Sequence, residues 1–216
     1  MIHYERPIIA RQALWPMLVV ILLASIVHYF YGWLIAAGFW LAVLLLAFLY
    51  RDPRRQVPPL PLGIVAPIDG RVISVNELRD PYLARGAVRI KIRGSLWGTF
   101  VLRSAMEGKV HGQWFGALPD NDEDRAIYQD SGIPAYAQWT RSDEGDDIVT
   151  TLTPRIAGKK VRCTVHSGER IGQGKRCGFV LFGVHAEIFV ATHCRIDVKS
   201  GDKVQSGTRV IATLVR

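Results

Sequence analysis

Residues 200–207 read Ser-Gly-Asp-Lys-Val-Gln-Ser-Gly, and residues 167–174 read Ser-Gly-Glu-Arg-Ile-Gly-Gln-Gly. Both copies follow the pattern Ser-Gly-acid-base-aliphatic-x-x-Gly, and each leads into a hydrophobic run, at 210–214 and 177–182. Glycines around a short base-aliphatic pair favour a strand, a turn, a short strand and a second turn. The duplication predicts a β-sandwich or barrel-like domain built from two related halves.

The rest of the C-terminal region has the same character. Residues 64–66, 71–75 and 87–93 are short strand-like runs, and the last of them alternates between apolar and basic side chains. No run after residue 51 has helical periodicity. We therefore expect a mostly β domain over residues 62–216.

The N-terminal region has a different composition. Residues 12–50 contain no Lys, Arg, Asp or Glu. A single helix of that length would span roughly 58 Å, about twice the hydrocarbon thickness of a bilayer. Two helices, over 14–30 and 33–50, fit better, so residues 1–50 are predicted to form a transmembrane hairpin. A re-entrant hairpin within one leaflet remains an alternative, because each half is short.

Basic residues stand on both sides of this hairpin. Arg6 and Arg11 precede it, and Arg51, Arg54 and Arg55 follow it. The positive-inside rule then places both flanks in the cytoplasm. The apolar run is too long for a cleaved signal peptide. We expect the protein in the inner membrane, with its C-terminal domain on the cytoplasmic side.

Between the two regions lies a proline-rich linker, residues 51–61, which read RDPRRQVPPLP. Four prolines in this stretch exclude a regular helix and favour an extended strap.

Charge is unevenly distributed in the C-terminal region. Residues 120–147 hold nine acids and two bases, whereas the rest of 51–216 carries 23 bases and nine acids, or +14. The acidic insert is either a solvated surface loop or a docking element for a larger membrane protein complex. The basic remainder suits anionic membrane phospholipid. We expect no nucleic-acid partner, because the chain has no motif for one.

The three cysteines, Cys163, Cys177 and Cys194, are an odd number and indicate no disulfide framework. Cysteine lies near histidine in Cys163-x-x-His166 and His193-Cys194, but the spacing is not that of a known zinc site. We expect structural residues here and no metal.

Several motifs, in order, resemble the short bacterial and archaeal type of phosphatidylserine decarboxylase over nearly the whole chain. They are residues 48–55 (FLYRDPRR), 66–72 (APIDGRV), 154–158 (PRIAG) and 168–172 (GERIG), followed by Phe182-Gly183. They resemble that family's FFRDP-x-R strap, its P-x-D-G-x-V strand, an I-A-G segment and its G-D-R-[IV]-G…F-G-S stretch.

The resemblance implies a self-processing enzyme. Members of that family are cut at a Gly-Ser bond, and the serine becomes a pyruvoyl group. An Asp and a His assist this cleavage. Here Gly183, at the cleavage position, is followed by Val184, which has no hydroxyl. Counting back from residues 106–110 puts Phe100 at the histidine position, so only Asp69 of the three residues remains.

Two hypotheses for the function follow. The first is a pseudoenzyme without pyruvoyl that serves as a phospholipid-binding, accessory or scaffold subunit. The alternative is an active phosphatidylserine decarboxylase that makes phosphatidylethanolamine by an atypical route. A second Gly-Ser bond, Gly94–Ser95, lies in a different segment, and His185 is a possible displaced base.

Overall fold

The structure is a computed structural model that describes residues 9–116, 134–156, 160–161 and 163–215. The chain divides into two compact units, residues 1–54 and 55–216. The predicted linker at 51–61 is therefore split between the units. Arg55 belongs to the second unit because its guanidinium bonds Asp69 within it.

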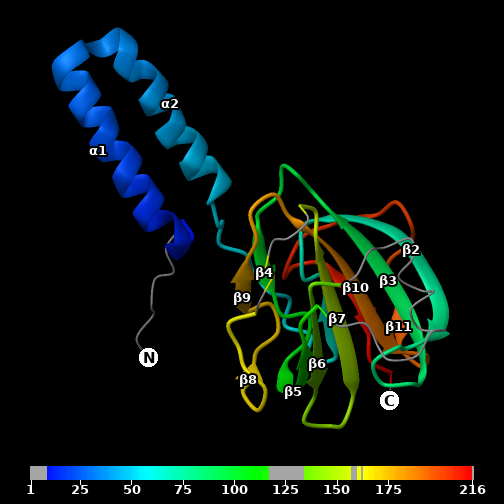
Figure 1. Cartoon of the computed structure of the whole chain (residues 1–216). Coiled ribbons are helices and arrows are strands. Elements are labelled where there is room, and N and C mark those ends of the chain that lie inside the picture. The colour runs from blue at the N-terminus through cyan, green and yellow to red at the C-terminus, as the bar shows by residue number, and fades with distance from the viewer. Residues whose placement is uncertain (1–8, 117–133, 157–159, 162, 216) are drawn as a thin grey trace. The chain divides into compact units, whose positions relative to one another are not determined.

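The first unit is the predicted helical hairpin (Figure 1). A short 3₁₀ turn at Arg11–Ala13 leads into α1, Leu14–Tyr31, and α2 follows at Trp33–Leu49. Gly32 joins the helices with a φ of +77°, which glycine adopts without strain. In the described residues α1 is long and apolar enough to cross a membrane, and α2 is a shorter apolar helix. The sidedness of the hairpin stays a prediction.

The second unit is built of strands, which confirms the mostly β expectation. In chain order they are β1 Gly63–Val65, β2 Gly70–Arg79, β3 Gly86–Gly94, β4 Val101–Arg103, β5 Gly108–Trp114, β6 Tyr136–Arg141, β7 Asp147–Pro154, β8 Arg170–Ile171, β9 Arg176–Phe179, β10 Val184–Ala191, β11 Arg195–Ile196, β12 Lys203–Val204 and β13 Val210–Thr213.

An eight-stranded antiparallel sheet, in the order β12-β2-β3-β10-β7-β6-β5-β8, dominates the unit. Figure 1 shows its long strands β2, β3, β10 and β7 side by side. Two smaller sheets, β1-β13-β11 and β4-β9, complete the fold. Alternate residues of the long strands, such as Ile90, Ile92 and Ile188, face one buried core, because side chains along a strand point to opposite faces.

The sequence repeat occupies the two edges of the large sheet. Strand β8 pairs with β5 and strand β12 pairs with β2, each through a two-residue ladder. The repeat glycines have positive φ at matching positions: Gly168 and Gly201 (+93° and +97°), and Gly174 and Gly207 (+65° and +75°). The copies therefore share a backbone conformation as well as a sequence pattern.

Gly70 and Gly108, at the starts of β2 and β5, are held against neighbouring backbone. A Cβ at Gly70 would lie 2.1 Å from the carbonyl oxygen of Arg93, and one at Gly108 would lie 2.2 Å from that of Arg141. We expect Gly70→Ala and Gly108→Ala each to lower stability by about 3 kcal/mol, since the strands must move apart. Thermal unfolding of the full-length chain in detergent measures this. Gly86→Ala is the control, because its Cβ would meet only Thr192 at 3.5 Å; equal losses in all three variants would contradict the prediction.

The acidic insert predicted at 120–147 has two parts. Residues 120–133 lie outside the described residues. Strand β6 follows within the segment, and Asp147 begins β7. The Asp147 carboxylate accepts hydrogen bonds from Trp139 Nε1 at 2.6 Å and from Arg141. This second part is thus sheet, and some of its charge is paired.

Candidate functional site

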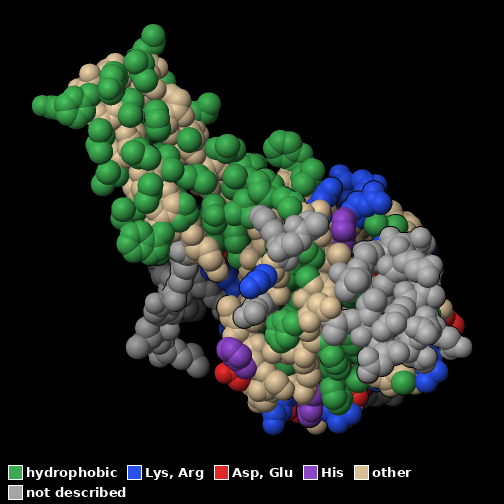
Figure 2. Space-filling view, in the orientation of Figure 1, with side chains coloured by type: hydrophobic (Ala, Val, Ile, Leu, Met, Phe, Trp, Pro, Cys, Tyr) green, Lys and Arg blue, Asp and Glu red, His purple; other side chains and the backbone are tan. Residues whose placement is uncertain are grey.

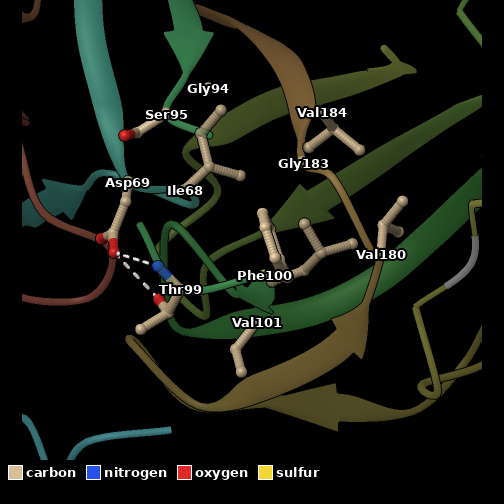
Figure 3. A pocket seen from close by; sticks show the side chains of 11 residues that line it. Ile68, Asp69, Gly94, Ser95, Thr99, Phe100, Val101, Val180, Gly183 and Val184 are labelled. Atoms are coloured by element: carbon tan, nitrogen blue, oxygen red, sulfur yellow. Dashed lines mark hydrogen bonds between the residues drawn. The ribbon is translucent and has the colours of Figure 1, made fainter. Parts of the chain in front are cut away.

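A small pocket lies where the end of β3 meets the beginning of β10. Gly94 approaches Val184 so closely that a Cβ at Gly94 would lie 2.0 Å from the Val184 carbonyl oxygen. The pocket has about the room of one water molecule. It is lined by Ile68, Asp69, Gly94, Ser95, Thr99, Phe100, Val101, Leu102, Val180, Gly183 and Val184 (Figure 3).

The four positions selected from the sequence all line this pocket. Asp69 precedes β2, Phe100 precedes β4, and Gly183 and Val184 stand at the start of β10. They are separated by up to 115 residues along the chain and are brought together by the sheet. Figure 3 shows Phe100 between Asp69 on one side and Val180 and Val184 on the other.

Phe100 and Val184 make the interior of the pocket apolar. Their exposed fractions are 3% and 1%. The Phe100 ring also packs edge-on against Phe179, with ring centroids 6.4 Å apart, and lies tilted against the Phe182 ring at 6.3 Å. This packing leaves little space for water beside the Gly183–Val184 bond.

Asp69 is the charged group of the pocket, and its carboxylate is fully engaged. The Arg55 guanidinium bonds both carboxylate oxygens, with Nη2 to Oδ2 at 2.6 Å. The backbone N–H groups of Thr99 and Ser206 each donate at 2.8 Å, and the Thr99 hydroxyl donates at 2.9 Å. Burial raises the pKa of Asp69, but Arg55 and these N–H groups more than offset it, so the pKa lies below 3.8.

The ion pair of Arg55 and Asp69 connects two of the sequence motifs, residues 48–55 and 66–72. Arg55 ends the strap and Asp69 belongs to the Asp-Gly strand start, while Ser206 lies in the second copy of the repeat. Sequence reasoning missed Arg55, Thr99 and Ser206 as site residues. The strap motif was a signal for Arg55, but nothing in the local sequence pairs it with Asp69.

Ser95 also reaches the pocket, although it lies far from Val184 in sequence. Its backbone N–H donates to the Asp69 carbonyl oxygen at 2.8 Å, and its hydroxyl accepts from the Trp97 N–H at 3.2 Å. The carbonyl oxygen of Gly94 accepts a hydrogen bond from Arg155 Nη1 at 3.0 Å. The second Gly-Ser bond is therefore part of the same site.

His185 lies outside the pocket. It follows Val184 directly in β10, so its side chain points to the opposite face of the sheet. Burial lowers its pKa, and the positive charges of Arg155, Arg93 and Lys91 lower it further. The structure thus gives His185 no contact with the pocket from which it would act as a displaced base.

The cysteine and histidine pairs do not converge on one another. Among the described residues no three His, Cys, Asp or Glu side chains are arranged to hold a metal ion. Cys163 and Cys177 are buried in the same apolar core, whereas His166 and His193 lie near Glu169 and Asp146 respectively.

Comparison with known proteins gives relatives over almost the full length of the chain. No protein-family model matches it. The phosphatidylserine decarboxylase proenzyme of Nitrosomonas eutropha is 33% identical, with 97% of each chain covered. The proenzyme of Nitrosomonas europaea is 32% identical over 97% of each chain, and that of Cupriavidus metallidurans is 29% identical over 98% of each.

Proposed function

The chain belongs to the phosphatidylserine decarboxylase family, and we propose that it is a membrane-anchored member that has lost pyruvoyl chemistry and serves as a phospholipid-binding accessory or scaffold subunit. Its β-unit would act at the cytoplasmic face of the inner membrane. The observation that carries this proposal is the presence of Phe100 and Val184, packed and buried, around Asp69.

The residues present do not fit a pyruvoyl group at position 184. Valine has no hydroxyl to attack the Gly183 carbonyl, and a phenylalanine ring can neither take nor give a proton. Asp69 is held as an anion by Arg55, Thr99 and Ser206, which supports a structural role for its carboxylate. The small volume left beside Val184 agrees with this view.

One observation favours the alternative, an active decarboxylase that is cut elsewhere. Ser95 follows a glycine whose carbonyl oxygen is bonded by the Arg155 guanidinium, and a donor at that position polarises a carbonyl toward attack. In the structure, however, the Ser95 hydroxyl accepts the Trp97 N–H, and Asp69, the carboxylate of the pocket, is engaged by Arg55, Thr99 and Ser206.

The intact mass of the full-length protein, purified in detergent, distinguishes these functions. We expect one chain of 216 residues, 24.2 kDa. Cleavage after Gly183 would release residues 184–216 and would overturn the proposal. Cleavage after Gly94 would give fragments 1–94 and 95–216 and would support the atypical route, and a decarboxylase assay on phosphatidylserine vesicles would then test the activity.

A further inference from the structure

A row of basic side chains crosses one edge of the large sheet. In the strand register Lys203 of β12 lies opposite Arg71 of β2, Arg71 opposite Arg93 of β3, and Arg93 opposite His185 of β10. Residues paired in this way share one face, and neighbouring strands are about 4.8 Å apart. The basic row, as we call Lys203, Arg71, Arg93 and His185, is therefore continuous over four strands.

The basic row lies on the outer face of the sheet. Its members alternate along their strands with Val72, Ile92 and Ala186, which are buried in the core. Arg71, Arg93 and Lys203 are exposed, and His185 is half-buried. Figure 2 shows Lys and Arg side chains gathered beside a histidine on one face of the β-unit.

Acidic side chains of the described residues do not neutralise this row. Glu187, two residues beyond His185 on the same face, is already matched by two cations, Lys91 at 3.6 Å and Arg89 at 3.9 Å. Among the described residues no acidic side chain forms an ion pair with Arg71, Arg93 or Lys203. Within the part of the chain that the structure describes, the basic row therefore keeps its positive charge.

Exposed apolar side chains follow the row at the ends of its strands. Leu96 and Trp97 come directly after β3 and have exposed fractions of 50% and 76%. Phe182, 41% exposed, stands just before β10 and packs on Phe100. A tryptophan beside a basic row is the combination that membrane interfaces favour, because its ring suits the headgroup region.

The strap is anchored beside this surface within the β-unit. Arg55 is fixed to Asp69, and the loop that carries Leu96 and Trp97 is bonded to Asp69 at both ends, through Ser95 and Thr99. Helix α2 ends at Leu49, and the residues from there to Arg55 reach at most about 20 Å when fully extended. The loop that carries Leu96 and Trp97 is therefore fixed, within the β-unit, to the residue at which the strap enters it.

We propose that the basic row and the Leu96–Trp97 loop form a docking surface for an anionic phospholipid bilayer, the basic row binding headgroup phosphates and Trp97 entering the interface. The inference rests on the proposed function and names the surface that it uses. Charge complementarity selects the bilayer over an apolar protein partner. The attractions of several cations to an anionic leaflet also add up.

The test uses the full-length chain in lipid nanodiscs of phosphatidylcholine, with and without anionic phosphatidylglycerol. Hydrogen–deuterium exchange of residues 89–98 is measured by mass spectrometry. We expect severalfold slower exchange in the anionic discs, and a loss of this difference at high salt, because salt screens exposed charges.

Variants assign the effect to the basic row. Arg71→Gln/Arg93→Gln should reduce the ratio of docked to undocked β-unit about thirtyfold, since each cation contributes about fivefold at an anionic surface. Lys109→Gln/Lys175→Gln removes the same charge from exposed positions outside the row and should retain the protection. Equal melting temperatures of the two variants show that both are folded.

Three results would overturn the docking surface. They are equal exchange in both kinds of disc for the unmodified chain, equal loss of protection in both double variants, and protection that depends on an added protein instead of the anionic lipid. The intact mass of the same preparation tests the proposed function separately, because that function predicts an uncut chain. An uncut chain without lipid protection removes only the docking surface, whereas a chain cut after Gly183 removes the proposed function and leaves the exchange result valid.

Discussion

The double variant Phe100→His/Val184→Ser is expected to cut itself between residues 183 and 184, whereas the unmodified chain remains intact. Serine at 184 supplies the hydroxyl that the bond lacks, and histidine at 100 supplies a base in the same pocket. Both substitutions reduce side-chain volume at buried positions, so the strands need not move. Intact-mass measurement would detect fragments 1–183 and 184–216.

The local backbone already suits this reaction. Gly183 has a φ of +76°, and its carbonyl oxygen accepts a hydrogen bond from the Arg155 N–H at 3.4 Å. A donor on that oxygen stabilises the charge that develops when a hydroxyl attacks the carbonyl. Asp69 remains in place on the opposite side of residue 100 (Figure 3). The prediction therefore attributes the missing cleavage to two side chains in an otherwise retained site.

The single variants are the controls for this experiment. Val184→Ser alone places a hydroxyl beside Phe100, which cannot accept its proton, and Phe100→His alone leaves valine at the bond. Both should stay uncut over the time in which the double variant is processed. A double variant that melts like the unmodified chain yet stays whole would show that further residues of the site have changed.

Much of the fold could be predicted because its determinants are local. Residues 14–49 contain no Lys, Arg, Asp or Glu, and the helices end within about one residue of the predicted positions. The turns of the repeat could also be predicted locally, since glycines adopt positive φ at matching positions in both copies. In such segments the local sequence determines the conformation, and contacts with distant parts of the chain are not needed to predict it.

The rest depends on contacts between distant segments. Strand β6 was not predicted, because it lies within a segment that is acidic overall. Its residues also do not alternate between buried and exposed, since most of them are buried and Trp139 packs on a second, smaller apolar cluster. Ser95 was assigned to a separate segment because sequence spacing cannot show that β3 ends beside β10. The same limit applied to Arg55 and Asp69, whose pairing requires the strap to return to the start of β2.

The pair of Arg55 and Asp69 should be among the strongest single determinants of stability in the β-unit. Both side chains are only 11% exposed, and the carboxylate is also bonded by Thr99 and Ser206. Replacing Arg55 by leucine leaves a buried anion without its countercharge, which costs about 3–5 kcal/mol. For a chain of this size, that corresponds to a melting temperature lower by roughly 6–20 °C.

The pH dependence identifies Asp69 as the group responsible. Its folded-state pKa is lowered, so the stabilisation is present above the ordinary value of 3.8 and is lost as the pH falls through the folded-state pKa. The difference in melting temperature between the unmodified chain and Arg55→Leu should therefore be largest near neutral pH and should shrink as the pH approaches and passes below 3.8. Arg54→Leu makes the same charge change at an exposed neighbour and should have little effect. If Arg55→Leu and Arg54→Leu melt together, neither the ion pair with Asp69 nor the bond from Arg55 to the Ser206 carbonyl oxygen stabilises the fold.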